Sequence, residues 1–259
     1  MQAVGRLCGM SDSHAEHARS FDRVAGAYQN ARPSYPAAAV EWVLEAAPGL
    51  RVVDLAAGTG KLTEVLVAAG AVVTAVEPLA NMRAELERAL PSVRAIAGTA
   101  ERMPLPDASA DAVFVAQAFH WFDAPAALAE IARVLVPGGV LGLVWNLRDE
   151  RVPWVADLTV ALRGAADVLA VSRGIAEGPL ESERFSAAER REFPNPVPFD
   201  RARLREWAAS TSRIAVLPEA ERAEALDAVV RLADEHPALA NRQTFDMPFV
   251  AVVGRATRR

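Results

Sequence analysis

Short apolar segments alternate along this chain with longer segments in which apolar residues recur every three or four positions. Segments such as 71–77 and 111–117 consist mainly of valine, alanine and phenylalanine. Such segments are typical of strands that are buried on both faces of a parallel sheet. The periodic segments predict amphipathic helices. The alternation of the two patterns predicts an α/β fold.

The boundaries of the expected elements follow from these patterns. We predict strands at 52–54, 71–77, 93–97, 111–117 and 140–146, and a final antiparallel strand at 245–256. We predict helices at 16–28, 37–47, 61–69, 126–135, 152–171, 202–209 and 219–233, with a further helix that opens at Pro78. Residues 174–191 are predicted to be rich in loops, and 192–199, which contains three prolines, is at best an edge strand.

The turn after the first predicted strand is the strongest candidate for binding a ligand. Gly58 and Gly60 lie between the strand that ends at Asp54 and the helix that begins at Lys61. Glycine adopts dihedrals closed to other residues and lets a ligand approach the backbone. The free N–H groups at the helix start favour an anionic or strongly accepting ligand.

Local residues separate the ligand classes that use such a turn. A phosphate-binding P-loop would need glycine at position 55 and serine or threonine at position 62, but both positions hold leucine. A dinucleotide fingerprint would need a third glycine where Thr63 stands. The alternative that this glycine-rich turn simply joins strand and helix and binds no ligand is not excluded at this point.

The segment Asp54-Leu-Ala-Ala-Gly-Thr-Gly60 resembles motif I of the class I S-adenosylmethionine-dependent methyltransferases, whose usual form is Asp-x-Gly-x-Gly-x-Gly. Ala56 replaces the first glycine, and we expect this change to be tolerated if the position needs a small residue rather than a positive φ. The resemblance implies a Rossmann-like fold with a mostly parallel seven-stranded sheet, an antiparallel last strand, helices on both faces and a helical cap.

Residues further along the chain extend the resemblance. Glu77 ends the second predicted strand, about 20 residues after the glycine turn, where an acid reaches ribose hydroxyls. The segment 98–106 resembles the family loop that lines the adenine, although Thr99 stands where aspartate is common. The implied cofactor-binding residues are Asp54, Ala56, Gly58, Gly60, Glu77, Pro78, Met82, Thr99, Ala100, Glu101 and Gln117. The implied cofactor is S-adenosyl-L-methionine, with S-adenosyl-L-homocysteine as the product.

The aromatic segment after the fourth predicted strand is expected to border the methyl acceptor, because ligands bind at the carboxyl edge of open α/β sheets. His120 is a candidate general base, although with aromatic neighbours on both sides it can equally serve to pack the loop. The acceptor pocket implied by the resemblance comprises Tyr28, Arg32, Tyr35, Phe119, His120, Trp121, Trp145 and Arg148.

The leader 20–36, the segment 117–123 and the helical last third look like the type 11 methyltransferase group and, more narrowly, like trans-aconitate methyltransferases. In those relatives a small carboxylic acid is esterified and arginines hold its other carboxylates. The resemblance implies one methyltransferase domain at 16–259 after a disordered stretch at 1–15, with lid helices at 16–48 and a cap insertion at about 150–191.

The amino-acid composition limits the classes of protein and of binding partner that remain possible. A chain of 259 residues with 52% hydrophobic and 24% charged residues suits one large α/β domain. Its net charge of −5 gives no general attraction to nucleic acid. A single cysteine excludes an intrachain disulfide and a cysteine-rich metal site, and no segment reaches the ~18 apolar residues that a membrane span needs. We therefore expect a cytoplasmic monomer or homodimer without metal, nucleic-acid or membrane partners, acting on a small-molecule methyl acceptor.

Two alternative functions remain at the level of sequence. A nicotinamide-dependent oxidoreductase would use the same strand–turn–helix corner, but it predicts the glycine that is missing at position 63. A module of methyltransferase fold that binds the cofactor without turnover would tolerate Ala56 and Thr99. The aromatic segment after the fourth strand favours an acceptor pocket over such a module.

Overall fold

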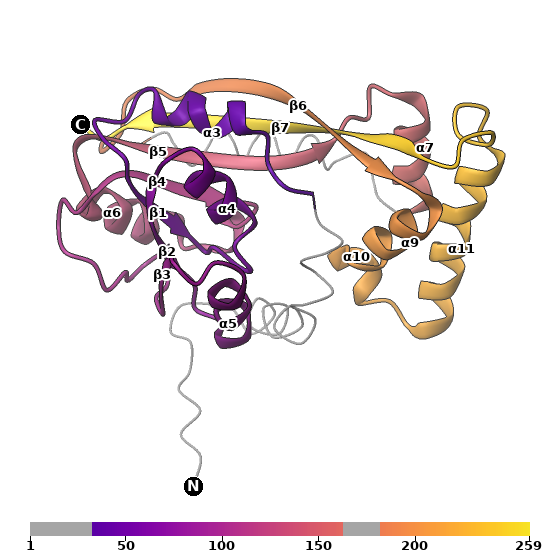
Figure 1. Cartoon of the computed structure of the whole chain (residues 1–259), viewed down its shortest axis with the longest axis horizontal. Helices are drawn as coiled ribbons and strands as arrows, with labels where there is room; N and C mark the ends of the chain where they lie inside the picture. The colour runs from indigo at the N-terminus through magenta and orange to yellow at the C-terminus, as the bar shows by residue number, and fades with distance from the viewer. Residues whose placement is uncertain (1–32, 163–181) are drawn as a thin grey trace, which may run out of the picture.

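A seven-stranded sheet forms the centre of the structure, a computed structural model that describes residues 33–162 and 182–259 (Figure 1). The strand order is β3-β2-β1-β4-β5-β7-β6. The first five strands in this order run parallel, and β7 runs antiparallel to both of its neighbours. The predicted fold class is thereby confirmed. The expected disordered stretch 1–15 and the predicted helix 16–28 lie outside the described residues.

The strands have the following bounds: β1 Arg51–Leu55, β2 Val72–Val76, β3 Arg94–Ile96, β4 Ala110–Ala116, β5 Leu135–Arg148, β6 Glu189–Phe199 and β7 Phe245–Thr257. The helices are α3 Ala37–Leu44, α4 Lys61–Ala68, α5 Ala80–Ala89, the 3₁₀ turn η1 Phe119–Trp121, α6 Ala124–Val134, α7 Pro153–Ala161, α9 Arg201–Ala209, α10 Ser212–Ala215 and α11 Glu219–Glu235. No helix among the described residues is long and apolar enough to cross a membrane.

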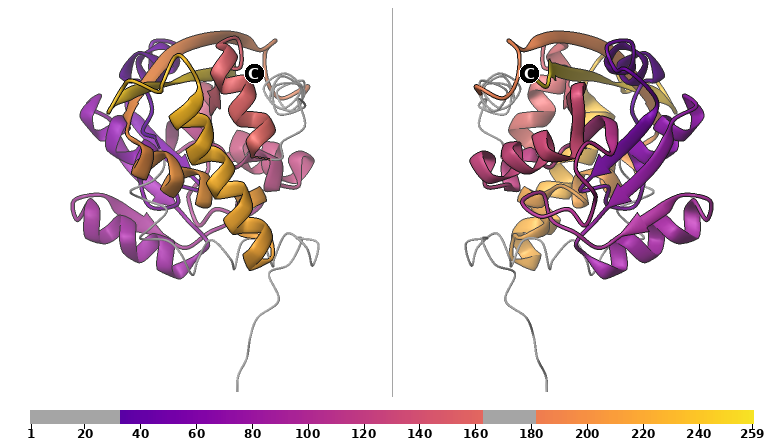
Figure 2. Two further views of the ribbon diagram at one scale, coloured as in Figure 1. Left: turned by 90° about the vertical axis from the view of Figure 1, so that its right-hand side faces the viewer. Right: turned by 90° about the vertical axis from the view of Figure 1, so that its left-hand side faces the viewer.

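Helices cover the parallel part of the sheet on both faces (Figure 2). Alternate side chains of β4 point to opposite faces, so Phe114 packs with α3 and α4 whereas Val113 packs with α6. Gly142 on β5 allows α3 to approach closely, because a Cβ there would lie 2.8 Å from Val43 Cγ1. Both faces of the sheet are therefore buried, which explains the nearly continuous apolar strands.

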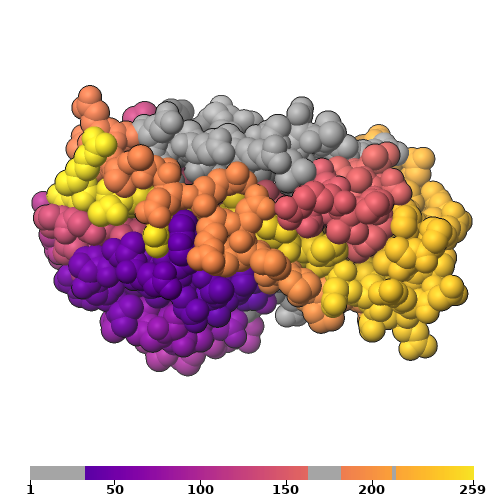
Figure 3. Space-filling view, turned by 90° about the horizontal axis from the view of Figure 1, so that it is seen from above, coloured from indigo at the N-terminus to yellow at the C-terminus, as the bar shows by residue number. Residues whose placement is uncertain are grey.

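The long strands β5, β7 and β6 carry the chain away from the parallel sheet to a helical lobe, which we define as α7, α9, α10 and α11 with the adjoining ends of β6 and β7 (Figure 1). The lobe has its own core, in which Trp207 packs against Phe199 and Phe249. Seen from above, the lobe forms one end of the molecule (Figure 3). The described residues of the predicted cap 150–191 contribute α7 to this lobe, and the helices after β6 complete it.

Several element boundaries differ from the prediction. Strand β5 begins at Leu135 rather than at 140, because Leu135 pairs with Ala110 before the register with β4 shifts between Ala110 and Ala112. Strand β6 is longer than predicted and lies at the sheet edge. Its prolines alternate along the strand, so the missing N–H donors all fall on one side, as an edge strand permits. Helix α7 is described only to Ala161, so the rest of the predicted helix 152–171 stays untested.

Candidate active site

The carboxyl ends of β1 and β4 form the point at which the strand order reverses. Strand β1 pairs with β2 on one side and with β4 on the other. Connections that leave such neighbours in opposite directions open a crevice at the carboxyl ends of the strands, and ligands of open α/β sheets bind there. The glycine turn 56–60 begins at this point and is tied to β2, because the Ala57 N–H donates to the Val76 carbonyl at 3.2 Å.

Three residues of the turn adopt left-handed dihedrals: Ala56 with φ of +56°, Gly58 with +58° and Gly60 with +90°. The condition under which we expected alanine to be tolerated at position 56 is therefore not met, because the position has a positive φ. The family's usual glycine would adopt this dihedral without strain, whereas an alanine in the left-handed conformation destabilises the fold by about 1–2 kcal/mol. At Gly60, a Cβ would lie 3.0 Å from Leu86 Cγ, so a side chain would be crowded by Leu86 as well as strained by φ. At Gly58, a Cβ would meet no atom of residues 33–162 and 182–259 within 4 Å.

Glu77 links the glycine turn to the start of α5. One carboxylate oxygen accepts the Gly58 N–H at 2.8 Å, and the other accepts the Leu79 N–H at 2.9 Å. The side chain is buried, with the residue only 4% exposed. A carboxylate has about four acceptor sites, so two N–H hydrogen bonds do not by themselves exhaust its capacity to accept. Glu77 thus lies beside the turn, as the proposed ribose contact requires.

Asp54, at the end of β1, is the second buried carboxyl group of this edge. Its Oδ2 accepts a hydrogen bond of 2.6 Å from the Thr63 hydroxyl. Its Oδ1 is buried and has no hydrogen-bond partner among the described residues. Burial raises the pKa of Asp54 to about 7; the Thr63 hydrogen bond opposes this shift and the charge of Glu77 adds to it. A cationic ligand group at this edge would stabilise the ionised form.

The loop that follows β3 borders the end of β2. Gly98 approaches so closely that a Cβ there would lie 2.9 Å from Val76 Cγ1. Thr99 and Arg102 exchange two backbone hydrogen bonds of 3.2 Å, which close a tight turn around the buried Ala100. The Glu101 carboxylate accepts the Asp123 N–H at 3.1 Å. The predicted adenine loop therefore contacts the segment that carries the candidate acceptor residues.

Of the remaining predicted cofactor residues, Pro78 is exposed and Met82 is buried on α5. Gln117 follows β4 directly and adopts a left-handed φ of +55°. Its side-chain amide donates to the Asn146 carbonyl on β5 at 2.9 Å. A non-glycine residue in this conformation costs of order 1–3 kcal/mol and persists where its surroundings determine it, often at functional sites.

The aromatic residues after β4 have different environments. His120 is exposed and lies with its ring centroid 4.6 Å from that of Trp121, which is half-buried. Phe119 and Trp145 are only 2% and 3% exposed and belong to the core between the sheet and α6. His120 and Trp121 therefore reach the surface of this edge, whereas burial favours a packing role for Phe119 and Trp145.

The other predicted acceptor residues are spread over the leader and β5. Tyr28 and Arg32 lie outside the described residues. Tyr35 is half-buried against the α3 face of the sheet. Arg148 donates to the Thr159 hydroxyl at 3.2 Å and lies 5.5 Å from the centroid of the Trp207 ring. These contacts join β5 to the helical lobe, so they favour a structural role for Arg148.

Sequence reasoning missed a group of amides that join the leader to this edge. Asn146 and Asn195 both donate to the Ser34 carbonyl, at 3.0 and 2.8 Å. Asn195 also donates to Asn146 Oδ1 at 2.9 Å. Asn146 could have been found from its place near the end of β5, since polar residues gather at that edge. No comparable signal exists for Asn195, which lies between two prolines of the edge strand.

The residues at this edge fit S-adenosylmethionine. Within the described residues, the space at Gly58 would admit close approach of a ligand to the backbone. Glu77 carries the acceptor type that a ribose needs, and Asp54 Oδ1, which has no hydrogen-bond partner in the described part of the chain, suits a positively charged group nearby. The position of a third fingerprint glycine is occupied by Thr63, which is fully buried and bonded to Asp54. This arrangement does not suit the nicotinamide dinucleotide alternative.

Known proteins resemble this chain over part or nearly all of its length. A family model described as a methyltransferase domain matches residues 53–143. An uncharacterized methyltransferase of Mycobacterium tuberculosis is 43% identical over 248 residues, which are 96% of this chain and 99% of the relative. A malonyl-[acyl-carrier protein] O-methyltransferase of Serratia marcescens is 35% identical over 128 residues, which are 46% of this chain and 50% of that protein.

A solved structure gives the same result. A protein from Anaeromyxobacter dehalogenans, described as a type II methyltransferase, superposes with a TM-score of 0.67 and 25% identity, over 88% of this chain and 97% of that one. The fold, the glycine turn beside Glu77 and the nearly full-length relative lead to one conclusion: the chain belongs to the class I S-adenosylmethionine-dependent methyltransferases.

Proposed function

We propose that this methyltransferase binds S-adenosylmethionine at the turn 56–60 and transfers its methyl group to an oxygen of a small carboxylic acid. The cofactor assignment rests chiefly on Glu77, whose carboxylate accepts the Gly58 and Leu79 N–H groups at the carboxyl edge of the sheet. These bonds fix the carboxylate orientation before a ligand arrives, so little side-chain entropy is lost on binding.

Each part of this edge has a distinct role in the proposed reaction. When bound, the cofactor supplies a methyl group that is activated by a positively charged sulfur. The Gly58 backbone would admit the methionine end, and the Glu77 carboxylate would accept hydrogen bonds from the ribose hydroxyls. Thr99, Ala100 and Glu101 would border the adenine end. The chain itself mainly holds the acceptor in line and excludes water, because an activated methyl group needs no enzyme nucleophile.

The acceptor class rests on two observations. The leader and the segment after β4 resemble those of trans-aconitate methyltransferases, which esterify a carboxylic acid. The matching part of the Serratia marcescens relative belongs to an O-methyltransferase that acts on a malonyl group. A carboxylate is already ionised at neutral pH, so its oxygen needs no general base. A phenol retains its proton at this pH and would require a base such as His120.

This difference gives a test of the acceptor. Purified protein would be incubated with S-adenosylmethionine and a panel of di- and tricarboxylic acids, fatty acids and phenols, and methylated products and S-adenosylhomocysteine would be quantified by mass spectrometry. We expect a methyl ester from an acid, and we expect His120→Gln to change kcat by less than about threefold. Methylation of phenols alone, with a loss of about 100-fold or more in His120→Gln, would contradict the carboxylic acid assignment.

A module that binds the cofactor without turnover is the remaining alternative. It predicts that S-adenosylhomocysteine binds while no member of a broad acceptor panel is methylated. The exposed His120 and half-buried Trp121 beside the predicted adenine loop favour an enzyme, since a module has no need of such groups at this edge. Calorimetry and the acceptor panel together separate the two functions.

A further inference from the structure

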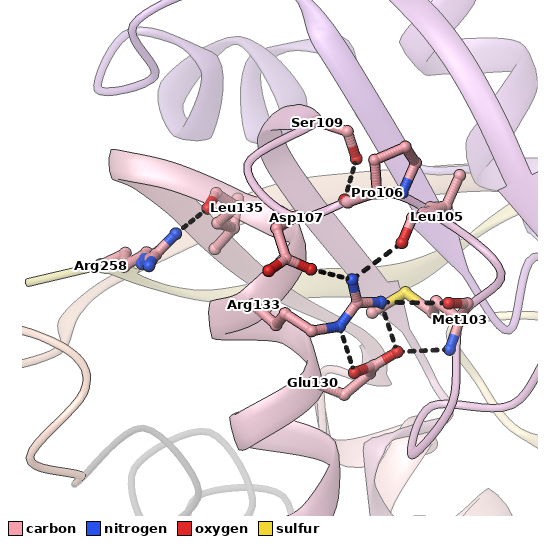
Figure 4. Close-up of polar contacts among 9 residues, drawn as sticks. All are labelled: Met103, Leu105, Pro106, Asp107, Ser109, Glu130, Arg133, Leu135 and Arg258. Carbon is pink, nitrogen blue, oxygen red and sulfur yellow. Dashed lines mark hydrogen bonds and ion pairs between the residues drawn. The ribbon is translucent and has the colours of Figure 1, made fainter.

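Arg133 on α6 contacts the loop between β3 and β4 through its two terminal guanidinium nitrogens, and its Nε pairs with Glu130 on the same helix (Figure 4). It donates to the Leu105 carbonyl at 2.8 Å and to the Met103 carbonyl at 3.1 Å. It also pairs with the Glu130 carboxylate at 2.7 and 2.8 Å and with Asp107 at 2.6 Å. Such a planar, forked donor set is specific to arginine, because the ammonium of lysine cannot reach separated acceptors in one plane.

Glu130 completes the attachment of the same loop. Its Oε1 accepts the Met103 N–H at 2.7 Å, so both backbone polar groups of Met103 are satisfied by side chains of α6. Arg133 beside it holds the pKa of the Glu130 carboxyl below its usual value. The pair is shielded from solvent, with side-chain exposures of 32% for Arg133 and 14% for Glu130, whereas Asp107 is 79% exposed. Asp107 therefore lies at the rim of this cluster.

Two other contacts bind the loop to α6 at its ends. Near its start, the Glu101 carboxylate accepts the N–H of Asp123, and Asp123 caps α6 through the Ala126 N–H. At its end, the Ala108 N–H donates to the Arg133 carbonyl at 2.9 Å. The loop 99–108 contains no strand or helix of its own. Its path is therefore determined largely by α6.

From this geometry we infer that Arg133 and Glu130 are positioning residues for the adenine end of the cofactor site. They fix residues 103–105, and this fixes the tight turn at Thr99–Glu101 that borders the expected adenine position. The inference rests on the proposed cofactor function. It adds that recognition of the adenine amino group depends on a helix that does not itself contact the ligand.

Calorimetric titrations of the full-length protein with S-adenosylhomocysteine and S-inosylhomocysteine test this inference, because the second ligand has a carbonyl in place of the adenine amino group. We expect Arg133→Lys and Glu130→Gln to weaken S-adenosylhomocysteine binding about tenfold or more, since small displacements of a binding loop have large effects. We also expect the preference for adenine over hypoxanthine to fall in both variants. Asp107→Asn is the matched control and should bind both ligands within about twofold of the parent.

Each outcome is decisive. A folded Arg133→Lys or Glu130→Gln variant with the affinity and adenine preference of the parent would overturn the inference. Equal losses for both ligands, with the preference unchanged, would also overturn it, because they would reveal only general destabilisation. If Arg133→Lys does not fold, Glu130→Gln decides, since glutamine keeps the size of the side chain but removes the carboxylate that orients the Arg133 guanidinium. A parent protein that binds neither ligand would refute the proposed function itself.

Discussion

The carboxyl edge of the sheet and the helical lobe contribute to the stability of the fold with opposite signs. At the edge, two carboxyl groups, Asp54 and Glu77, are 1% and 4% exposed, and the turn between them contains three left-handed residues. The lobe is built around aromatic side chains that pack edge to face, such as Trp154 on Phe245 and Trp207 on Phe249. Buried charge and strained dihedrals destabilise a fold, whereas aromatic burial stabilises it.

This contrast suggests a division of labour within one chain. The edge keeps polar groups and backbone N–H donors preorganised for a ligand at a cost in stability. The lobe and the helix-covered sheet provide apolar burial that offsets this cost. Substitutions in the two regions should therefore differ in sign and in the property they affect: stability for the lobe, and pH dependence or binding for the edge.

The largest effect is expected in the lobe. Trp207→Ala removes a side chain that is 2% exposed and that contacts Phe199, Phe249 and the Arg148 guanidinium. We expect the free energy of unfolding in urea to fall by roughly 3–5 kcal/mol. Trp121→Ala, which removes the same side chain from the half-buried edge, should cost clearly less. Equal losses in the two variants would remove the distinction between the regions.

The next effect concerns the buried acid at the edge. Because the pKa of Asp54 is raised to about 7, its contribution to stability is greatest below the unfolded value near 3.8 and is lost as pH rises through 7. Asparagine does not titrate, so Asp54→Asn lacks this loss. The unfolding free energy of the variant minus that of the parent should therefore increase as the pH is raised from 4 to 8, by up to roughly 4 kcal/mol. Urea titrations at several pH values measure this difference, and parallel profiles would show that Asp54 is ionised in the folded protein without penalty.

The smallest effect concerns the turn itself. Ala56→Gly relieves a left-handed alanine at a cost in unfolded-chain entropy, so we expect a gain of up to about 1 kcal/mol. Ala57→Gly makes the same chemical change at a neighbouring residue without a positive φ and should lose roughly 0.5–1 kcal/mol. Thermal unfolding of both variants gives the signs. A loss in Ala56→Gly as large as in Ala57→Gly would show that the dihedral carries no strain.

The sequence predicted the parallel sheet well because its strands are nearly continuous apolar segments that only a sheet covered on both faces can bury. The edge position of β6 followed from its prolines, which cannot donate within a central strand. The dihedral at Ala56 could not be predicted, because alanine itself carries no signal for a left-handed conformation. The motif position should have carried more weight, since the family has glycine there.

The polar contacts at the site were harder to predict than the elements that carry them. Asn195 meets Ser34 across 161 positions of sequence, and no local pattern relates them. Arg133 was placed correctly on a helix, but its binding of residues 103–107 depends on how α6 lies over the sheet. Likewise, the joining of α7 with α9 and α11 into one lobe depends on the lengths of β5, β6 and β7, which exceed the predicted ones.

The most direct test of the site is calorimetric titration of S-adenosylhomocysteine into the parent protein and into Glu77→Gln. We expect the parent to bind one equivalent, and we expect the variant, shown to be folded by circular dichroism, to bind about 10–100-fold more weakly, because hydrogen bonds to a charged group contribute about 1.5–3 kcal/mol. Equal affinities would place the ribose away from Glu77, and no heat of binding in the parent at millimolar ligand would contradict the site altogether.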